Sequence, residues 1–436
     1  MSNQKVIKTE KIVFGAQEID RKFLIRSSCN KFSWDIVLYY MQKKRIYLDY
    51  AATTPVDPQV FSAMRPYFME KFGNPMSIHT FGREASEAVE KSRQTAAIFF
   101  GCDPSEIIFT SGATESNNLA IKGSVITQTN HQGASKPHVI TTQFEHSCVL
   151  NSCKKLEEQG MAEVAYLPVG KDGIVRVNDI EKAIKANTLL VSVMYVNNEI
   201  GTIQPIKEIG ILIERLNKSR EQKILFHTDA TQAINYFDCK VDNLKVDLLS
   251  MSAHKIYGPK GVGCLYIRKN IRVTRIQDGG GQEFNLRGGT HNVPGIVGLG
   301  AALQIAEKER KKVSKLVEKL RDHMIARVTQ EIKGVKLNGS KLKRSPNNAN
   351  FIFQDVEGEG LLLGLDIEGV AVSTGSACSS GDLRPSHVLL AIGIPEEESH
   401  GSLRVTLGKY TTKTEIDYFI KSLKEVVARL RKIAGK

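Results

Sequence analysis

The stretch EIIFTSGATESNN, residues 106–118, joins an apolar run to a turn of small residues and then to a helical sequence. Apolar runs of the same kind return along the chain, and helical sequences separate many of them. They lie at 138–142, 189–196, 223–227, 246–252 and 263–268. Near-continuous apolar strands that alternate with helices are typical of a mostly parallel sheet that is buried on both faces. The sequence therefore predicts an α/β fold.

The two ends of the chain differ from this central pattern. After about residue 300 the sequence turns to long amphipathic helices with a few short strands, which predicts a smaller α+β domain. Residues 1–45 are rich in Lys, Arg and Ser but also contain acidic residues, which transit peptides mostly lack. We expect 1–45 to be a presequence, a disordered extension or a wrongly assigned start. We expect 60–305 to form the large domain, and 46–59 with 306–436 the small one.

Composition excludes several classes of protein. The net charge of +13 would suit nucleic acid or an acidic partner, but Lys and Arg are spread along all 436 residues, which disfavours direct nucleic-acid binding. No apolar run approaches the roughly 20 residues that a membrane helix needs. None of the seven cysteines forms a CxxC pair, so we expect reduced thiols rather than zinc or disulfides. We expect Cys148 and Cys153 to pack in the core.

Ligands of such sheets bind beyond the carboxyl ends of the strands, so the loops that follow the strands are the places to search for chemistry. In 106–118, small residues would let backbone N–H groups approach an anion, and the start of the helix favours negative charge. The segment is either a phosphate cradle or simply a well-capped helix, and both interpretations stay open.

Two further loops that follow strands contain an amine and a carboxylate. In SMSAHKIYGPKGVG (250–263), Lys255 is either a surface charge or an amine that traps a carbonyl group, with Ser252 and His254 as phosphate donors. In FHTDATQAI (226–234), Asp229 is either a helix cap or the carboxylate that pyridoxal phosphate needs against its ring nitrogen. It is rare for a lysine, an aspartate and a phosphate cradle to occur together by chance, each on a loop that follows a strand.

Other polar residues share this set of loops. His146 follows the strand at 138–142 and could stack on a planar ring or relay a proton, although a single histidine is more often structural. Asn198 and Gln232 could hold a ring oxygen. Arg404, in the small domain, suits bidentate capture of an amino-acid carboxylate, or else forms a surface ion pair.

One cysteine stands apart from the other six. Cys378 lies in STGSACSSGDLRPSHV (373–388), among residues that are too small to bury its thiol in a packed core. It is either an incidental thiol on an exposed loop or a nucleophile on a tether.

Taken together, these pieces resemble the cysteine desulfurases of the iron–sulfur assembly type, in the class V branch of the fold-type I enzymes that use pyridoxal phosphate. The resemblance runs from Ile46 to near the C-terminus. Besides Glu145 and His146, the matching motifs are YLDYAATTP (47–55), FGNPMSIH (72–79), SGATESNN (111–118), NNEIGTIQP (197–205), DATQ (229–232), SAHKIYGPKG (252–261), GGGQEFNLRGGT (279–290) and STGSAC (373–378). It implies an aminotransferase-like fold whose large domain holds a mostly parallel seven-stranded sheet.

The resemblance also implies a role for each site residue. Lys255 would hold pyridoxal phosphate covalently, Asp229 would pair with its ring nitrogen, and His146 would lie over the ring. Asn198 and Gln232 would contact the ring, and Arg404 with Asn198 would bind the substrate. The phosphate would be held by Ala113, Thr114, Ser252 and His254, and by Thr290 from the second subunit of a homodimer.

The activity implied by the resemblance answers the question that Cys378 raises. Its thiolate would attack the sulfur of bound L-cysteine, leaving L-alanine and a persulfide on Cys378. The sulfur would pass to an iron–sulfur scaffold protein, with tRNA thiolation as a further outlet. No metal site is implied, beyond transient ligation of a cluster by that persulfide.

The sequence departs from the family at three positions, and other functions stay open. Asp382 and Arg384 put charges where a more neutral stretch is expected, which could change the sulfur acceptor, and Ala253 replaces a common glycine. The alternatives are a selenocysteine lyase, a class V aminotransferase, or a binding protein without catalysis on the same fold. We expect the cytoplasm, or a mitochondrion-related organelle if 1–45 acts as a presequence.

Overall fold

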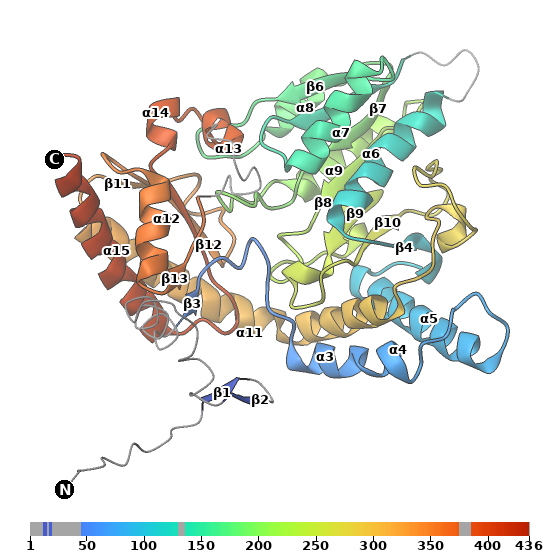
Figure 1. The fold of residues 1–436 in the computed structure, drawn as a ribbon. Coiled ribbons are helices and arrows are strands. Elements are labelled where there is room, and N and C mark those ends of the chain that lie inside the picture. The colour runs from blue at the N-terminus through green and yellow to red at the C-terminus, as the bar shows by residue number, and fades with distance from the viewer. Residues whose placement is uncertain (1–11, 15–16, 20–44, 130–135, 375–384, 436) are drawn as a thin grey trace, which may run out of the picture. The chain divides into compact units, whose positions relative to one another are not determined.

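The computed structural model describes residues 12–14, 17–19, 45–129, 136–374 and 385–435 (Figure 1). Cys378, Asp382 and Arg384 lie outside these ranges. The chain divides after Arg45 into two parts. In the first part, β1 (Ile12–Phe14) pairs with β2 (Gln17–Ile19) in an antiparallel manner. Residues 46–436 form the second part.

A seven-stranded sheet forms the centre of this second part, with the strands in the order β4-β10-β9-β8-β7-β5-β6. The strands are β4 (Ile107–Thr110), β5 (His138–Thr142), β6 (Glu163–Leu167), β7 (Thr188–Ser192), β8 (Leu225–Asp229), β9 (Leu248–Ser252) and β10 (Gly263–Ile267). β10 runs antiparallel to both of its neighbours, and the other pairs are parallel. The predicted α/β fold with a mostly parallel seven-stranded sheet is confirmed.

Apolar side chains cover both faces of this sheet, which explains why its strands are apolar throughout. Along β4, Ile107 and Phe109 join one hydrophobic cluster, whereas Ile108 between them joins another. The first cluster includes residues of α3 (Pro58–Met64), α5 (Thr80–Phe100), α8 (Val177–Ala183), α9 (Ile206–Asn217), α10 (Val241–Leu244) and the start of α11 (Val293–Glu331). The second includes residues of α6 (Ala113–Thr129) and α7 (Ser147–Glu158). Helices therefore shield the sheet from water on each side (Figure 1).

A separate hydrophobic cluster surrounds a three-stranded antiparallel sheet of β11 (Val335–Leu337), β12 (Asn348–Phe353) and β14 (Ser402–Thr406). Two helices, α12 (Gly358–Ile367) and α15 (Lys413–Ile433), pack in it. β3 (Ile46–Tyr47) pairs with β13 (Val370–Ala371), which brings residues just after Arg45 into this second core. The short elements that remain are α4 (Pro66–Met69), α13 (His387–Ala391), α14 (Glu396–Ser399) and the 3-10 turns η1 (Pro104–Glu106), η2 (Ala253–Lys255) and η3 (Glu283–Asn285).

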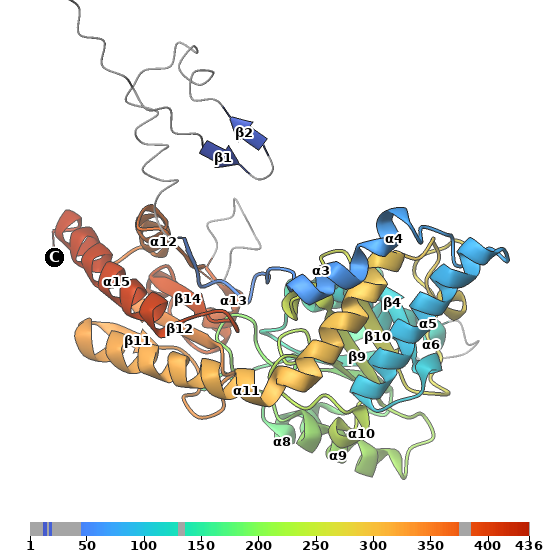
Figure 2. The same cartoon turned by 90° about the horizontal axis from the view of Figure 1, so that it is seen from below.

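One helix of 39 residues, α11, connects the two cores. It packs against α3 and α5 at its beginning and against β11 and α15 further along (Figure 2). Ala306 belongs to the core of the large sheet, whereas Val317 belongs to the smaller core. The helix is unbroken at residue 306, and the domain limits at 59/60 and 305/306 stay a prediction.

No helix among the described residues combines the length and the apolar character that crossing a membrane requires.

Candidate functional site

A cavity of about 560 Å³ opens where β8 and β9 end, at Asp229 and Ser252. Most of the predicted site residues line it: Ala113, Thr114, His146, Asn198, Asp229, Gln232, Ser252, His254, Lys255 and Arg404. Thr290 is exposed and does not line it. The fold thus brings together residues that lie as far as 291 positions apart, between Ala113 and Arg404.

The amine of Lys255 lies at the end of the turn η2, which follows β9. Its Nζ donates to the carbonyl oxygen of Ala51 and, at 2.7 Å, to that of Ala52. Gln232 donates to the same Ala51 oxygen at 3.0 Å. The segment after β3 therefore provides backbone acceptors that hold the amine at the wall of the cavity.

Within the part of the chain that the structure describes, the carboxylate of Asp229 accepts one hydrogen bond at each oxygen. Oδ1 accepts from the backbone N–H of Thr231 at 2.9 Å, and Oδ2 accepts from Asn117 Nδ2 at 2.6 Å. The residue is 6% exposed, so its orientation is set by these two donors. A fixed, buried carboxylate is the kind of group that holds a ring nitrogen in its protonated form.

His146 caps the first turn of α7, where its Nδ1 accepts from the backbone N–H of Cys148 at 3.2 Å. Burial lowers the pKa of His146, although the carboxylate of Asp229 acts in the opposite direction. The imidazole is therefore neutral at neutral pH. Since Nδ1 is an acceptor, the proton lies on Nε2.

The start of α6 supplies backbone amides from Ala113 and Thr114. Gly112, just before it, has φ +151°, and a Cβ there would come 3.5 Å from the hydroxyl of Ser252. This narrow space at a helix N-terminus is suited to a small anion. Burial, with the charges of Lys255 and Lys260, lowers the pKa of His254 to about 4, so this histidine is neutral at pH 7.

Arg404 reaches the cavity from β14 in the smaller core. Its Nη2 pairs with Asp49 at 2.8 Å, and its Nη1 donates to the carbonyl oxygen of Asn198 at 3.1 Å. The side chain is 5% exposed, so a surface ion pair is the wrong description. Arg404 Nε and Asn198 Oδ1 are buried and have no hydrogen-bond partner within the described residues.

A protein-family model described as Aminotransferase class-V matches residues 46–419. This chain belongs to the class-V aminotransferase family. Among curated relatives, the cysteine desulfurase IscS of Dictyoglomus turgidum (strain DSM 6724 / Z-1310) is 50% identical over 392 residues, which are 90% of this chain and 97% of the relative. The mitosomal cysteine desulfurase of Encephalitozoon cuniculi (strain GB-M1) is 48% identical over 394 residues, covering 90% and 88%.

Solved structures agree with this assignment to the family. A NifS-like protein is 39% identical, with a TM-score of 0.81 over 88% of this chain and 100% of its own. A structure described as SspA in complex with cysteine is 37% identical, with a TM-score of 0.73 over 85% and 100%. The resemblance to cysteine desulfurases is confirmed.

The cavity fits pyridoxal phosphate, the cofactor that the class-V family implies. An amine, a fixed carboxylate and an anion-sized space at a helix start match the aldehyde, ring nitrogen and phosphate of that molecule. Three lining residues carry a buried polar atom that lacks a partner within the described part of the chain, namely Asn198, Thr231 and Arg404. Such atoms are rare in folded proteins, and a polar ligand would satisfy them.

Sequence reasoning missed several residues that line the cavity, including Thr53, Thr231 and Lys260. It was wrong in part about Cys148. That residue touches the hydrophobic core but also lines the cavity, and its Sγ lies 3.0 Å from His146 Nδ1. Cys153, five residues later on α7, is fully buried as predicted. The position of Cys148 two residues after His146 was the available signal.

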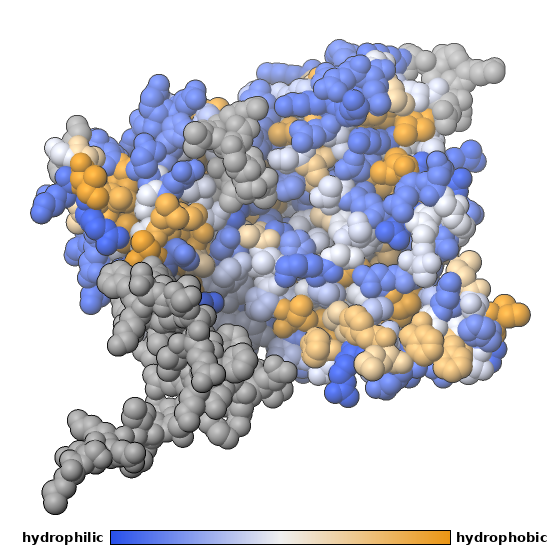
Figure 3. Space-filling model, viewed as in Figure 1, coloured by the Kyte–Doolittle hydropathy of each residue, from blue (hydrophilic) through white to orange (hydrophobic). Residues whose placement is uncertain are grey.

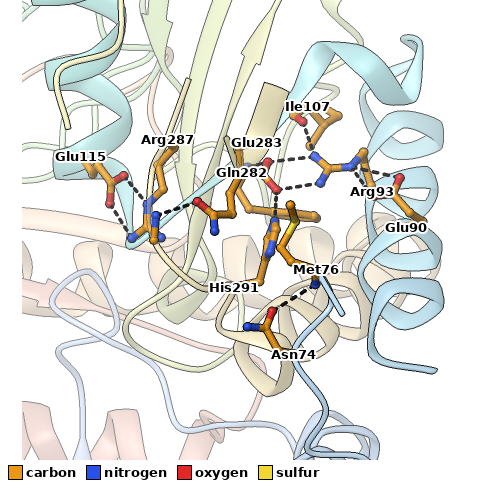
Figure 4. Close-up of polar contacts among 12 residues, drawn as sticks. Asn74, Met76, Glu90, Arg93, Ile107, Glu115, Gln282, Glu283, Arg287 and His291 are labelled. Carbon is orange, nitrogen blue, oxygen red and sulfur yellow. Dashed lines mark hydrogen bonds and ion pairs between the residues drawn. The ribbon is translucent and has the colours of Figure 1, made fainter. Parts of the chain in front are cut away.

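The glycine-rich motif that ends at Thr290 is anchored by a buried carboxylate (Figure 4). Glu283 pairs with both terminal nitrogens of Arg93, at 2.9 and 2.7 Å, and accepts from the backbone N–H of Phe109 at 2.7 Å. His291, next to Thr290, contacts Oε1 of this carboxylate through its Nε2 at 2.7 Å. The Arg93 and Glu283 side chains are only 3% and 2% exposed.

A second ion pair joins the same motif to the start of α6. Arg287 donates to Glu115 at 2.9 Å (Figure 4). Glu115 also accepts from the backbone N–H of Ser111 at 2.7 Å. The segment that carries Thr290 is therefore tied to the same loop that forms the anion-sized space.

Replacing Glu283 by alanine is expected to destabilise the fold by about 3–5 kcal/mol, because Arg93 would stay buried without its bidentate partner. Burial alone would raise the pKa of Glu283, but hydrogen bonds from Arg93 and His291 outweigh it and lower that pKa to about 2. An unfolded glutamate has a pKa of 4.5. The stabilisation that ionised Glu283 gives the folded state is therefore complete above pH 4.5 and is lost as the pH falls toward 2.

Urea unfolding at pH 7 and pH 3 measures this effect. The matched control is Glu181→Ala, which removes an ion pair with Arg215 between two side chains that are 44% and 62% exposed. Exposed pairs contribute little, so the control should unfold like the wild type. Equal losses in the two variants would contradict the anchoring role of Glu283.

Proposed function

We propose that the chain is a cysteine desulfurase that depends on pyridoxal phosphate. It converts L-cysteine to L-alanine and retains the sulfur as a persulfide on Cys378. The main support for this function is that Lys255, Asp229 and His146 line the same cavity. The chain is also 50% identical to a cysteine desulfurase over 90% of its length.

The chain's own residues would hold the cofactor from several sides. Lys255 would bind it covalently through Nζ, and Asp229 would keep the ring nitrogen protonated. When bound, pyridoxal phosphate supplies an electron-withdrawing ring that stabilises negative charge on the substrate carbon next to the amine. The phosphate would be held by Ala113, Thr114, Ser252 and His254, and by Thr290 of a second subunit.

Other residues would act on the substrate. Arg404, held by Asp49 and the backbone of Asn198, would bind the carboxylate of L-cysteine. Its Nε has no hydrogen-bond partner among the described residues and is available for that contact. His146 would offer a hydrogen from Nε2 to a group bound in the cavity. The Cys378 thiolate would attack the substrate sulfur. A sulfur–sulfur bond forms, the carbon–sulfur bond breaks, and its electron pair remains on the carbon that becomes the methyl group of alanine.

The test is to incubate the cofactor-loaded enzyme with L-cysteine and a thiol reductant, and to measure alanine and sulfide together. Equal amounts of the two products are expected. Absence of both would sink the proposal. Faster turnover of L-selenocysteine by orders of magnitude would favour the lyase alternative, and a protein that cannot be loaded with cofactor would favour a binding protein.

We also propose that two copies of the chain form a homodimer. A surface over α3, α4 and the start of α5, which we call the aromatic face, exposes large apolar side chains, and orange patches mark this region in Figure 3. Its members are Phe61, Phe68, Met69, Phe72, Met76, Ile78 and Phe81. Contiguous exposed apolar patches commonly mark interfaces between proteins. Thr290, exposed at the end of the loop anchored by Glu283, would then be able to reach a partner's cavity.

Placing a charge on the aromatic face tests the dimer. Phe68, which is 57% exposed, would be changed to aspartate, and the matched control is Leu342→Asp, at a residue 96% exposed outside this face. Sedimentation should give twice the chain mass of 48.3 kDa for the wild type and the control, but a single chain for Phe68→Asp. A single-chain mass for the wild type itself would refute the dimer.

The sulfur acceptor is inferred from the motifs of the chain, and the compartment from its relatives. We propose an iron–sulfur scaffold protein as the main acceptor, with tRNA thiolation as a further outlet, because the motifs resemble the iron–sulfur assembly type. The relatives include both bacterial enzymes and a mitosomal one. Cytoplasm and mitochondrion-related organelle therefore remain the two predicted locations.

A further inference from the structure

Cys148 lies between two residues that would hold the cofactor. Its Sγ is 3.0 Å from Nδ1 of His146 and 3.0 Å from Nδ2 of Asn117. The same Nδ2 atom of Asn117 is 2.6 Å from Oδ2 of Asp229. These three contacts form a continuous chain from the imidazole to the carboxylate, along one wall of the cavity.

The direction of each hydrogen bond follows from the chemistry of the groups. An ionised carboxylate can only accept, so Nδ2 of Asn117 faces Asp229 and gives its second hydrogen to the sulfur. Nδ1 of His146 already accepts from the backbone N–H of Cys148, so its contact with sulfur must be donated by the S–H group. Cys148 therefore donates to His146 and accepts from Asn117, as a protonated thiol can.

Two further observations agree with this assignment. Burial raises the pKa of Cys148 to about 12, and the charge of Asp229 adds to the effect, so the thiol stays protonated at neutral pH. Asn117 is fully buried, and its Oδ1 has no hydrogen-bond partner within the described residues. Among the described residues, the amide is thus oriented by its contacts with Asp229 and Cys148.

We propose that Cys148 is a positioning residue that links His146 to Asp229 through Asn117, so that the imidazole and the carboxylate are held as one unit. The thiol would keep the plane of the imidazole fixed with its proton on Nε2. The amide would keep the carboxylate aligned with the ring nitrogen. This inference rests on the proposed function only in assuming that pyridoxal phosphate binds in this cavity.

The experiment compares the pH dependence of the visible absorbance of the cofactor-loaded enzyme in five proteins: wild type, Cys148→Ala, Cys148→Ser, Cys153→Ala and Cys153→Ser. Cys153 is the matched control, because it is a fully buried thiol on the same helix that does not line the cavity. The spectrum reports the charge state around the ring and needs no turnover.

Cys148→Ala is expected to displace the midpoint of the absorbance change by about half a pH unit or more, since Asn117 loses an acceptor and Asp229 its alignment. Its kcat should fall about tenfold with little change in KM, as loss of one hydrogen bond predicts. Cys148→Ser retains a donor and an acceptor and should restore most of both properties. The Cys153 variants should match the wild type.

Asn117→Ala tests the link from its other end. It should displace the midpoint in the same direction, and the double variant with Cys148→Ala should add little, because the two residues act through one chain of contacts. If Cys148→Ala cannot be purified with cofactor, Asn117→Ala and Cys148→Ser decide the question.

Three results would overturn the proposal: a wild-type midpoint in Cys148→Ala, equal displacements in the Cys148 and Cys153 variants, or a Cys148→Ser enzyme as altered as Cys148→Ala. If the wild-type enzyme released no sulfide from L-cysteine, the proposed function would fail. The spectral comparison would still decide the role of Cys148.

Discussion

Replacing Lys255 by alanine should reduce alanine and sulfide formation below about one-thousandth of the wild-type rate, since loss of a group that acts with others removes nearly all turnover. The amine that Ala51 and Ala52 hold at the cavity wall would be absent. The cofactor would be held only by non-covalent contacts and should be lost on gel filtration.

Borohydride reduction followed by peptide mapping tests the site of attachment directly. The wild-type enzyme should carry the label on the peptide that contains Lys255, and Lys255→Ala should carry none. Lys260→Ala is the matched control, because Lys260 also lines the cavity five residues later. If Lys255→Ala still carried a reduced covalent adduct in the cavity, the assignment of the attachment site would be wrong.

Replacing Cys378 by alanine should abolish sulfur release while leaving the cofactor in place. The loss should again be about a thousandfold or more, because the thiolate is the only nucleophile in the proposed sulfur transfer. All residues that would hold the cofactor lie elsewhere in the chain. The variant should therefore keep the visible absorbance of the bound cofactor, and added L-cysteine should still change that spectrum.

Two measurements separate this result from general damage. Mass spectrometry after a brief incubation with L-cysteine should find one additional sulfur on the wild-type peptide that contains Cys378, and none there in the variant. Cys264→Ala, at a fully buried thiol of β10, provides the control and should still form the persulfide on Cys378. Undiminished sulfide release by Cys378→Ala would refute the assigned nucleophile.

The strands that sequence reasoning found are those buried on both faces. β5 and β10, for example, are buried at every position, so their apolar runs were plain in the sequence. β6 was missed because it lies at the edge of the sheet, where Glu163 is exposed and only Leu167 is fully buried. The strand predicted at 189–196 ends at Ser192 in the structure, although the backbone N–H groups of Val193 and Tyr195 still donate to carbonyl oxygens of β8.

The site was predictable to a different extent. Spacing alone left the phosphate cradle and Lys255 with two interpretations each, and only the ordered set of family motifs decided between them. The link through Cys148 could not be predicted, because it depends on the facing sides of α6 and α7, which meet only in the folded chain. Sequence reasoning assigned Cys148 and Cys153 to the core together, although the position of Cys148 two residues after His146 separated these two thiols of one helix.

The bend in α11 sets the distance between the two sides of the cavity. At 1.5 Å per residue its 39 residues rise about 58 Å along the helix axis, and Figure 2 shows that this axis changes direction between the first and the later part of the helix. Because the first part packs against α3 and α5 and the later part against β11 and α15, each part is fixed to a different core. The only proline of α11 stands in its first turn, so the change in direction does not arise from a proline within the helix. A change in the angle of this bend would therefore alter the separation between Arg404 and Lys255.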